Sequence, residues 1–276
     1  MSSDNYDRRF GALKRLYGAQ SYTLLRELHI GVVGLGGVGS WAVEALARTG
    51  VGRLTLIDYD AVCLSNINRQ LPALTSTLHQ KKFAVLAERI AEINPDCLCT
   101  TVDNFLSLEN MGELLALSHS FDYVVDAIDS IRVKAAMIHH CKRNKIPIIV
   151  TGGAGGLTDP TQIQVADLSR TFNDPLAAKV RSTLRATHGF TKNSQRSFGV
   201  ECVFSSQQPL YPKADGSVSH EKPGVHGVSL DCRLGYGSVS FVTASFGFIA
   251  ASRAVNRALK RRLVNSIDLT ETLPLP

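Results

Sequence analysis

Paired cysteines are missing from this chain of 276 residues. It contains six cysteines, and no two of them stand at the C-x-x-C spacing of zinc sites and redox motifs. The chain also opens without the charged and apolar pattern of a secretory signal peptide. We therefore expect a cytoplasmic protein with free thiols in a reducing compartment, and no zinc. The six are Cys63, Cys97, Cys99, Cys141, Cys202 and Cys232.

A hydrophobic run that would clearly span a membrane is missing as well. One uncharged stretch, residues 234–252, passes a crude length test. It is rich in glycine, serine and alanine, so we predict a buried helix or a helix–helix interface. Membrane association through 234–252 stays open as the alternative.

The sequence has no internal repeat and no linker that would divide it into independent domains. With 276 residues, 44% of them hydrophobic, it can bury the core of one large α/β domain. We therefore treat 1–276 as a single domain, with a core over 28–150 and an elaboration over 151–276. The net charge of +6 fits either a polyanionic partner or an ordinary basic protein.

Strand-like and helix-like segments alternate through the first 150 residues. Apolar runs typical of strands lie at 30–33, 54–58, 99–102, 123–127 and 146–150. Helical patterns lie between them, at 38–48, 81–93, 108–117 and 132–142. This alternation predicts an α/β fold with a doubly wound, mostly parallel, Rossmann-like sheet.

The pattern changes after residue 150. A glycine-rich segment at 151–156 precedes a predicted antiparallel strand at 162–165, and Asp174-Pro175 is typical of a helix start. Residues 210–228 have no periodicity and are predicted to form a long loop. We therefore expect antiparallel strands and helices to extend the sheet.

The segment after the first predicted strand is rich in glycine. Its motif is Gly34-x-Gly36-Gly37-x-Gly39, and a helical pattern follows directly. Glycines at these positions let the backbone turn tightly and approach a phosphate or ribose at a helix N-terminus. The motif predicts a nucleotide site and leaves NAD, FAD and ATP open.

Polar side chains after the second predicted strand indicate which nucleotide binds. Asp58 lies about twenty residues past the glycines, where a carboxylate accepts hydrogen bonds from ribose hydroxyls. A second carboxylate, Asp60, is less expected for NAD. Asn66, Arg69 and Lys82 are suited to a triphosphate. Taken singly, each is also explained as part of a polar turn or a solvated helix face.

Taken in order, these motifs and Asp129 resemble the ubiquitin-activating-like adenylating superfamily, whose bacterial members activate sulfur-carrier proteins. The resemblance covers about residues 9–165. It implies that ATP lies under the glycine loop, with Asp58 on the ribose and Asn66, Arg69 and Lys82 on the phosphates. It also implies that Asp129 binds Mg²⁺ near the α-phosphate.

In that superfamily an arginine near the N-terminus of one subunit reaches the ATP of the other. The resemblance therefore implies a homodimer and gives this role to Arg15, with Arg9 as the alternative. The implied reaction is attack of a carboxylate on the α-phosphate of ATP, which releases pyrophosphate and forms an acyl-adenylate. Asp129 with Mg²⁺, Arg69, Lys82 and Arg15 would stabilise the charge on the phosphates.

The second half carries motifs of its own, such as Asp174-Pro-Leu-Ala-Ala178 and Gly199-Val-Glu-Cys202. With the front of the chain they resemble the tRNA threonylcarbamoyladenosine dehydratase branch, over about residues 8–258. That branch adenylates the threonyl carboxylate of a modified adenosine beside the anticodon. The ureido nitrogen then closes a hydantoin-type ring with net loss of water. The resemblance leaves open a monovalent cation, and a cysteine desulfurase with its sulfur-acceptor protein as partners.

Two other functions stay open. A sulfur-carrier activator would adenylate the C-terminal glycine of a carrier protein, with Cys202 or Cys232 as a reactive thiol. We expect both to be packed thiols instead. An NAD-dependent redox enzyme or a non-catalytic nucleotide sensor would have no assigned role for four residues, which are Asn66, Arg69, Lys82 and Asp129.

Charge of one sign gathers in the second half. No acidic residue stands between positions 175 and 200, while five basic ones do. Basic side chains with polar neighbours are an electrostatic footprint for an RNA backbone, so we predict a tRNA-binding patch, with a solvated helix face as the alternative. Basic residues at 253–262 would extend this patch or form an exposed tail. The five are Lys179, Arg181, Arg185, Lys192 and Arg196.

Overall fold

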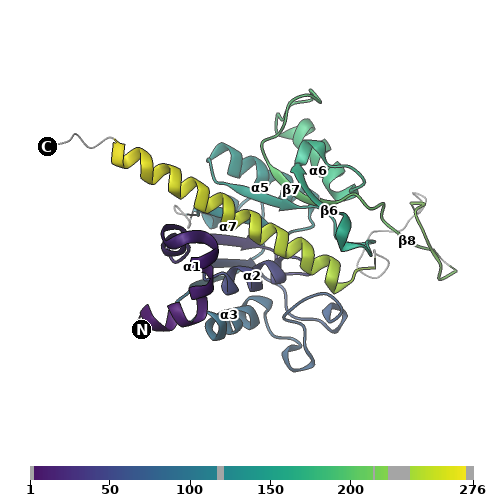
Figure 1. The fold of residues 1–276 in the computed structure, drawn as a ribbon. Coiled ribbons are helices and arrows are strands. Elements are labelled where there is room, and N and C mark those ends of the chain that lie inside the picture. Colours follow the sequence, from purple (N-terminus) through teal and green to yellow (C-terminus); the bar gives the residue numbers. More distant parts are fainter. Residues whose placement is uncertain (1–2, 117–120, 214, 223–236, 272–276) are drawn as a thin grey trace.

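A seven-stranded sheet forms the centre of the protein (Figure 1). The computed structural model describes residues 3–116, 121–213, 215–222 and 237–271. The strand order is β3-β2-β1-β4-β5-β7-β6, and all neighbouring pairs are parallel except β7 and β6. The strands are β1 (His29–Val33), β2 (Arg53–Asp58), β3 (Leu98–Asp103), β4 (Tyr123–Asp126), β5 (Ile148–Thr151), β6 (Ile163–Asp167) and β7 (Glu201–Ser205).

Helices cover both faces of this sheet. One face packs against α1 (Ser3–Leu25), α2 (Gly39–Arg48), α3 (Lys82–Ile93) and α7 (Ser240–Glu271). The other packs against α4 (Met111–Ala116), α5 (Ile131–Arg143) and α6 (Pro175–Thr187). Val124 and Val125 belong to different clusters because successive side chains of a strand point to opposite faces. The predicted doubly wound, mostly parallel fold is confirmed.

The second half of the chain joins the same sheet. The predicted antiparallel strand is present as β6, and Asp174 caps α6 by accepting a hydrogen bond from the Ala177 amide at 2.8 Å. The prediction of a loop over 210–228 is wrong in part, because β8 (Tyr211–Pro212) and β9 (Val218–Ser219) pair as a short antiparallel hairpin. Residues 214 and 223–228 of that stretch lie outside the described residues.

Helix α7 accounts for the uncharged stretch at 234–252. Its residues Val242 and Phe246 are buried, and the helix packs along α2. A Cβ on Gly247 would lie 2.5 Å from the carbonyl oxygen of Val38, so only glycine permits this approach. The predicted buried helix is confirmed for 240–252, whereas 237–239 are not helical and 234–236 lie outside the described residues. Among the described helices, none is long and apolar enough to cross a membrane.

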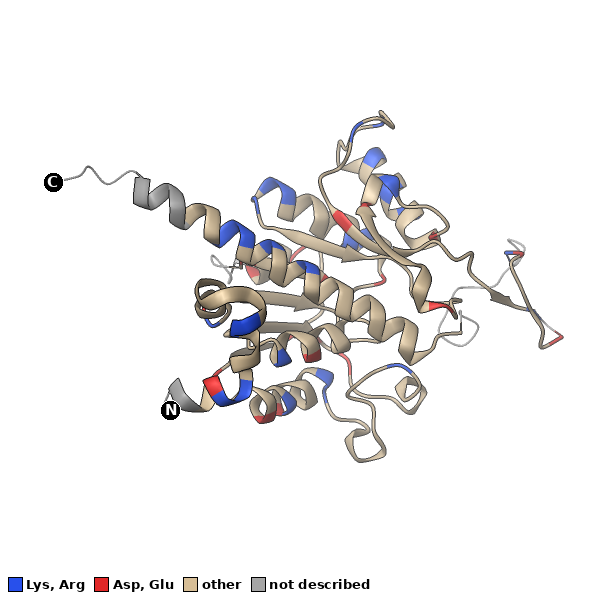
Figure 2. Cartoon of the chain, in the orientation of Figure 1, with Lys and Arg blue, Asp and Glu red and all other residues tan. Residues whose placement is uncertain are grey.

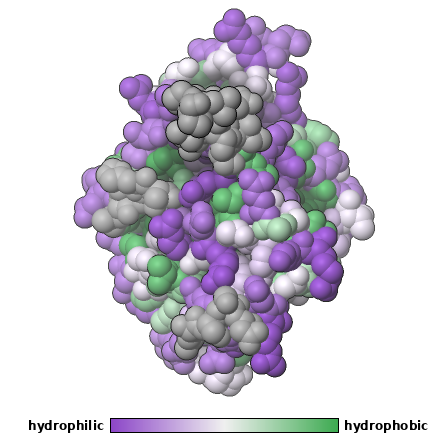
Figure 3. Space-filling view, turned by 60° about the vertical axis from the view of Figure 1, so that its left-hand side comes forward, coloured by the Kyte–Doolittle hydropathy of each residue, from purple (hydrophilic) through white to green (hydrophobic). Residues whose placement is uncertain are grey.

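The two ends of the strands face different parts of the chain. The glycine segment follows β1 at the carboxyl edge of the sheet. Helix α1, which the sequence pattern does not predict, lies at the amino edge, where the Tyr6 hydroxyl donates to the carbonyl oxygen of Gly50 at 2.6 Å. Helix α7 also reaches that edge, since Arg262 pairs with Asp122 at 2.6 Å (Nε to Oδ1) just before β4. Figure 3 shows this side of the molecule, where hydrophobic residues are scattered in small areas among hydrophilic ones.

Candidate nucleotide-binding site

The glycine loop joins β1 to α2 at the carboxyl edge of the sheet. Gly34 has a φ of +85°, and a Cβ on Gly39 would lie 1.8 Å from the Gly34 carbonyl oxygen. These two glycines are therefore required by the turn itself. Gly37 is close to α7, with Thr243 Cγ2 3.3 Å from the position of a Cβ. At Gly36 the nearest atom would be 3.9 Å away, which leaves this part of the backbone open to a ligand.

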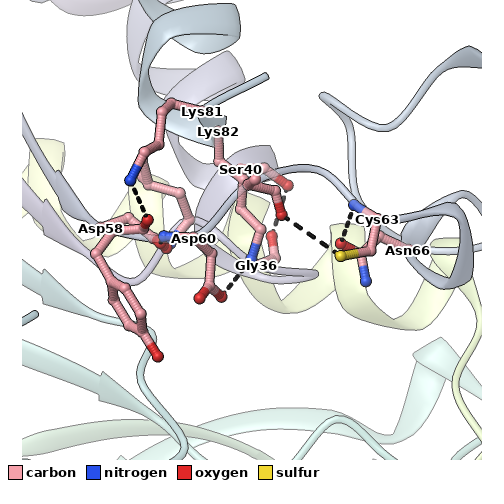
Figure 4. A network of polar contacts seen from close by, with 11 residues as sticks. Gly36, Ser40, Asp58, Asp60, Cys63, Asn66, Lys81 and Lys82 are labelled. Carbon is pink, nitrogen blue, oxygen red and sulfur yellow. Dashed lines mark hydrogen bonds and ion pairs between the residues drawn. The ribbon is translucent and has the colours of Figure 1, made fainter. Parts of the chain in front are cut away.

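Asp58 is the last residue of β2 and lies close to Asp60 (Figure 4), and it connects the strand to the glycine loop. Its Oδ2 accepts a hydrogen bond from the Leu35 amide at 2.6 Å, and its Oδ1 accepts one from the Asp60 amide at 2.8 Å. Each carboxylate oxygen can accept a second hydrogen bond, so the side chain remains able to bind a ribose hydroxyl.

Two exposed aromatic rings lie beside Asp58 and were not expected from the sequence. Tyr59 and Phe105 are 49% and 46% exposed and meet edge to face, with 5.2 Å between ring centroids. Each residue follows directly or closely after a strand of the parallel sheet, which is the signal that could have identified it. The pair gives the carboxyl edge an apolar surface next to a carboxylate.

Lys82 begins α3 and is held by Asp60 (Figure 4). The Lys82 Nζ lies 2.7 Å from Asp60 Oδ2, and the side chains are 5% and 47% exposed. The ammonium is therefore buried under a carboxylate that itself reaches the surface. Neighbouring Lys81 turns elsewhere, and its Nζ donates to Asp103 Oδ1 at 2.8 Å.

Asn66 is the last residue of the 3-10 turn at Leu64–Asn66, and Arg69 lies three residues beyond it. Asn66 is buried, and its Oδ1 accepts a hydrogen bond from the Cys63 amide at 3.1 Å. The Arg69 guanidinium donates to the Ser65 carbonyl oxygen at 2.7 Å and its surroundings are exposed. Asn66 therefore shapes the turn, while Arg69 has a charged head at the surface.

The backbone of Arg69 is fixed from two helices. Its carbonyl oxygen accepts hydrogen bonds from Trp41 Nε1 of α2 at 3.0 Å and from Thr243 Oγ1 of α7 at 3.3 Å. The next residue, Gln70, is 7% exposed, and its Oε1 has no hydrogen-bond partner among the described residues. Helix α7 thus contributes to this site, although it lies 174 residues further along the chain.

The motif that carries Asp129 begins with a buried ion pair. Asp126 and Lys134 are 0% and 2% exposed, with Oδ1 and Nζ 2.8 Å apart. The Lys134 Nζ also donates to the Ile128 carbonyl oxygen at 2.9 Å, and Asp126 Oδ1 accepts from the Ile128 amide at 3.1 Å. Burial raises the pKa of the Asp126 carboxyl, and the nearby ammonium opposes that shift. This pair was missed because the sequence offers no reason to join positions 126 and 134.

Asp129 itself is exposed and follows this pair at the carboxyl edge. Beside it, the glycine-rich segment after β5 packs on Asp174, whose Oδ2 accepts from the Gly153 amide at 3.0 Å. A Cβ on Gly152 would lie 1.7 Å from that oxygen, which explains the glycine there. Burial raises the pKa of the Asp174 carboxyl.

Among the described thiols, Cys63 is exposed and the other four are partly or completely buried. Cys202 is completely buried in β7, and burial raises the pKa of its thiol. Burial likewise raises the pKa of Cys99 to about 11. A thiol with a raised pKa is a poor nucleophile, so Cys202 has the packing role that we predict. Cys232 lies outside the described residues.

Arg15 does not join the other predicted residues in the same chain. It is exposed on α1, whose contacts on both sides of it lie at the amino edge of the sheet. Arg9, the alternative, donates to the carbonyl oxygens of Glu92 and Ile93 at 3.1 and 3.3 Å, at the end of α3. Figure 1 shows α1 at the opposite end of the molecule from the start of α7.

The predicted basic patch lies on α6 and the loop that follows it (Figure 2). Lys179, Lys192 and Arg196 are exposed, whereas Arg181 is half-buried and donates to Thr171 Oγ1. Arg185 lies over the ring of Phe198, 5.3 Å from its centroid. A hollow of about 350 Å³ opens among these residues; it is lined by Ala178, Arg181, Ser182, Arg185, Ala186 and Lys192.

The basic end of α7 does not extend this patch. Arg253 and Arg257 both form ion pairs with Glu201, and Arg262 pairs with Asp122. These arginines fasten α7 to the sheet, so the expectation of a longer patch or of an exposed tail at 253–262 is wrong for the three of them. The sequence could not show this, because Glu201 is more than fifty residues away (52 for Arg253).

Among the described residues, no three His, Cys, Asp or Glu side chains gather as they do around a metal ion held by protein alone. Mg²⁺ in nucleotide sites is usually held by one or two carboxylates together with substrate phosphates and water. An exposed carboxylate such as Asp129, at the edge where the glycine loop opens, fits that mode.

Comparison with known proteins agrees with this geometry. The model of the ThiF family matches residues 6–272. The tRNA threonylcarbamoyladenosine dehydratase of Haemophilus influenzae is 49% identical over 259 residues, which cover 94% of this chain and 96% of that protein. The Escherichia coli protein of the same name is 50% identical over 260 residues, with 94% and 96% covered. A crystal structure of the Escherichia coli dehydratase in complex with ATP has a TM-score of 0.84 at 47% identity and covers 95% of this chain and 98% of that one.

Proposed function

The chain belongs to the ThiF family, and we propose that it catalyses the ATP-dependent dehydration of threonylcarbamoyladenosine, beside the anticodon of tRNA, to its cyclic hydantoin-type form. It is an ATP-dependent, tRNA-modifying enzyme that works through an acyl-adenylate. The observation that carries this conclusion is the identity with dehydratases over 94% of the chain, which extends well beyond the nucleotide-binding core.

The reaction has two chemical steps. An oxygen of the threonyl carboxylate attacks the α-phosphorus of ATP, the bond to the β-phosphate breaks, and pyrophosphate leaves. The ureido nitrogen then attacks the activated carbonyl carbon, AMP leaves with the carboxylate oxygen, and the nitrogen gives up its proton. The net change is loss of one water from the nucleoside, with ATP converted to AMP and pyrophosphate.

The residues at the carboxyl edge have different roles in this reaction. The backbone at Gly36 is open to the phosphates, and Asp58 keeps acceptor capacity for the ribose. Lys82 and Arg69 oppose the negative charge on the phosphates, and stabilisation of developing charge usually accelerates such reactions more than any other single effect. We propose that bound triphosphate takes over Lys82 from Asp60. Asp129 would hold Mg²⁺, which polarises the α-phosphate when it is bound.

We propose that the active unit is a homodimer in which Arg15 acts on the ATP of the other subunit. The position of α1 at the amino edge supports this, because the ATP residues of the same chain lie at the carboxyl edge. Mixing Arg15→Ala with Asp129→Ala subunits should restore up to about a quarter of the wild-type activity, because each mixed dimer would contain one intact site. No recovery, with subunits that exchange normally, would place Arg15 in its own chain's site.

We propose that tRNA binds to Lys179, Arg181, Arg185, Lys192 and Arg196, and that 28–150 binds the nucleotide while 151–276 recognises the RNA. We expect a cytoplasmic enzyme, because its substrate is tRNA. We also expect the protein to associate with a cysteine desulfurase and its sulfur-acceptor protein, which co-purification would test. A further expectation is a monovalent cation near 151–156, which is tested by comparing turnover in potassium, sodium and tetramethylammonium salts.

The deciding experiment is mass spectrometry of tRNA that carries threonylcarbamoyladenosine, after incubation with the protein, ATP and Mg²⁺. We expect loss of one water that requires ATP and disappears in Asp129→Ala. The matched control is Asp103→Ala, which removes another exposed carboxylate at the same edge, one that pairs with Lys81 and has no role in the proposed mechanism. An unchanged nucleoside, together with ATP–pyrophosphate exchange on a small protein ending in Gly-Gly, would instead establish a sulfur-carrier activator.

A further inference from the structure

Positive charge is concentrated in one layer of the molecule. Residues 130–158 and 175–200 contain no acidic residue, and they hold ten of the thirty lysines and arginines. The first stretch forms α5 and the second forms α6, and these helices pack together on the same face of the sheet. Figure 2 shows basic residues on both helices. The basic surface of α6 therefore has a neighbour that the proposed function does not use.

The cations at the end of α5 are exposed and are not paired with acids. Lys142, Arg143 and Lys145 are all exposed, and no described ion pair includes any of them. On α7, by contrast, Arg253 and Arg257 are paired with acids. Like charges held side by side without counter-charges repel one another, and a polyanion relieves that repulsion.

A pair of stacked imidazoles connects the two helices. The ring of His139, on α5, and that of His188, at the end of α6, lie 4.8 Å apart at 28°. A hollow of about 540 Å³ opens beside them; its polar lining comes from His139, His140, Arg143, Asn144, His188 and one acid, Glu109. The surface is thus continuous from the hollow on α6 to the last turn of α5.

This surface begins at the proposed catalytic residue. Helix α5 starts two residues after Asp129 and runs 13 residues to Arg143, a length of about 18 Å at about 1.5 Å per residue. That length corresponds to about five steps of a nucleic acid strand at roughly 3.4 Å each. A nucleoside placed at Asp129 would therefore have the phosphates of its own stem within reach of Arg143.

We infer that the tRNA-contacting surface continues from α6 across the stacked histidines onto the last turn of α5 and the residues just after it, where Lys142, Arg143 and Lys145 bind backbone phosphates of the stem beside the modified nucleoside. This inference rests on the proposed function and adds the α5 residues to it. Phosphate contacts of this kind fix the register of an RNA without reading its sequence.

The test is the salt dependence of tRNA binding by Arg143→Gln. Each phosphate contact contributes about one unit to the slope of log affinity against log salt. We expect Arg143→Gln to lower that slope by about one unit and to weaken binding about tenfold at moderate salt. The KM for ATP should not change. The matched control is Lys260→Gln, which removes one exposed charge from α7 on the other face.

The outcomes separate this inference from the proposed function. If wild-type protein and Lys260→Gln bind tRNA alike and Arg143→Gln does not differ from them in slope or affinity, the α5 surface is refuted and the dehydratase function stands. If the wild-type protein neither binds nor dehydrates tRNA, both fail together. Thermal melting checks that Arg143→Gln folds normally, as expected for an exposed side chain.

Discussion

The buried pair of Lys134 and Asp126 offers the sharpest separation of stability from catalysis in this protein. Lys134→Met keeps the length of the side chain and removes the ammonium, so the completely buried Asp126 carboxylate keeps only the Ile128 amide as a donor. Breaking a buried pair by removing one partner costs about 3–5 kcal/mol of unfolding free energy. Replacing both charges is often close to neutral. We therefore expect Lys134→Met to be strongly destabilised and the double variant with Asp126→Asn to regain most of the loss.

Turnover should not return with stability. The Lys134 ammonium also donates to the Ile128 carbonyl oxygen, one residue before Asp129, and methionine cannot replace that bond in either variant. A displacement of about 1 Å at a reacting group can cost about 100-fold in rate. We expect kcat of the double variant to stay at least about tenfold low, while the KM for ATP changes little because the glycine loop and Asp58 are untouched.

The measurements are urea unfolding at equilibrium and steady-state formation of AMP with modified tRNA as substrate. The matched control is Lys260→Met, which makes the same change at an exposed position of α7 and should stay within about 0.5 kcal/mol of the wild type. Recovery of both stability and kcat in the double variant would refute the positioning role. A Lys134→Met variant as stable as the control would refute the buried charge itself.

Three further outcomes follow from the geometry. Gly36→Ala should fold normally and raise the KM for ATP, because a methyl group fits there but would stand between the backbone and the phosphates. Gly39→Ala should lose about 3 kcal/mol of unfolding free energy, because its Cβ would clash with the backbone. Chemical unfolding and ATP kinetics of the two variants test this difference. Burial and the charge of a nearby arginine lower the pKa of His29 to about 4. As the pH falls, His29 therefore binds a proton in the unfolded chain before it does so in the folded protein, and the free energy of unfolding should decrease as the pH drops from about 6.5 towards 4. This decrease should be smaller in His29→Gln when unfolding is measured at pH 7 and pH 5. Cys202→Ala should cost about 1–2 kcal/mol of stability and keep full tRNA dehydration, since a buried thiol with a raised pKa takes no part in the chemistry.

Each of these expectations has a clear contrary result. Equal KM values for ATP in Gly36→Ala and wild type would remove the loop backbone from the binding site. An unchanged pH dependence in His29→Gln would mean that His29 is not the buried neutral group. A folded Cys202→Ala protein without turnover would revive the reactive thiol of a sulfur-carrier activator.

The periodicity of the sequence was sufficient to predict the sheet. Five strands of the first half and the antiparallel β6 are found within a few residues of their predicted positions, because short apolar runs bounded by turn residues are typical of strands buried in a parallel sheet. The glycine motif and Asp58 could also be predicted, since the turn from β1 and the end of β2 are local features. Even the uncharged 234–252 stretch was predictable as a buried helix, because its small residues suit close helix packing.

Other features depend on contacts between segments that lie far apart in the chain. Lys82 pairs with Asp60, Lys134 pairs with Asp126, and Glu201 pairs with two arginines of α7. None of these ion pairs follows from a local sequence pattern. The separation of α1 from the carboxyl edge likewise depends on how the whole sheet is covered. The sequence by itself therefore determined the strands and helices of the nucleotide-binding core and the chemistry of the nucleotide loop. Only the tertiary structure decided which charges are paired and which are left for a ligand, because burial and electrostatic pairing depend on distances between residues far apart in the chain.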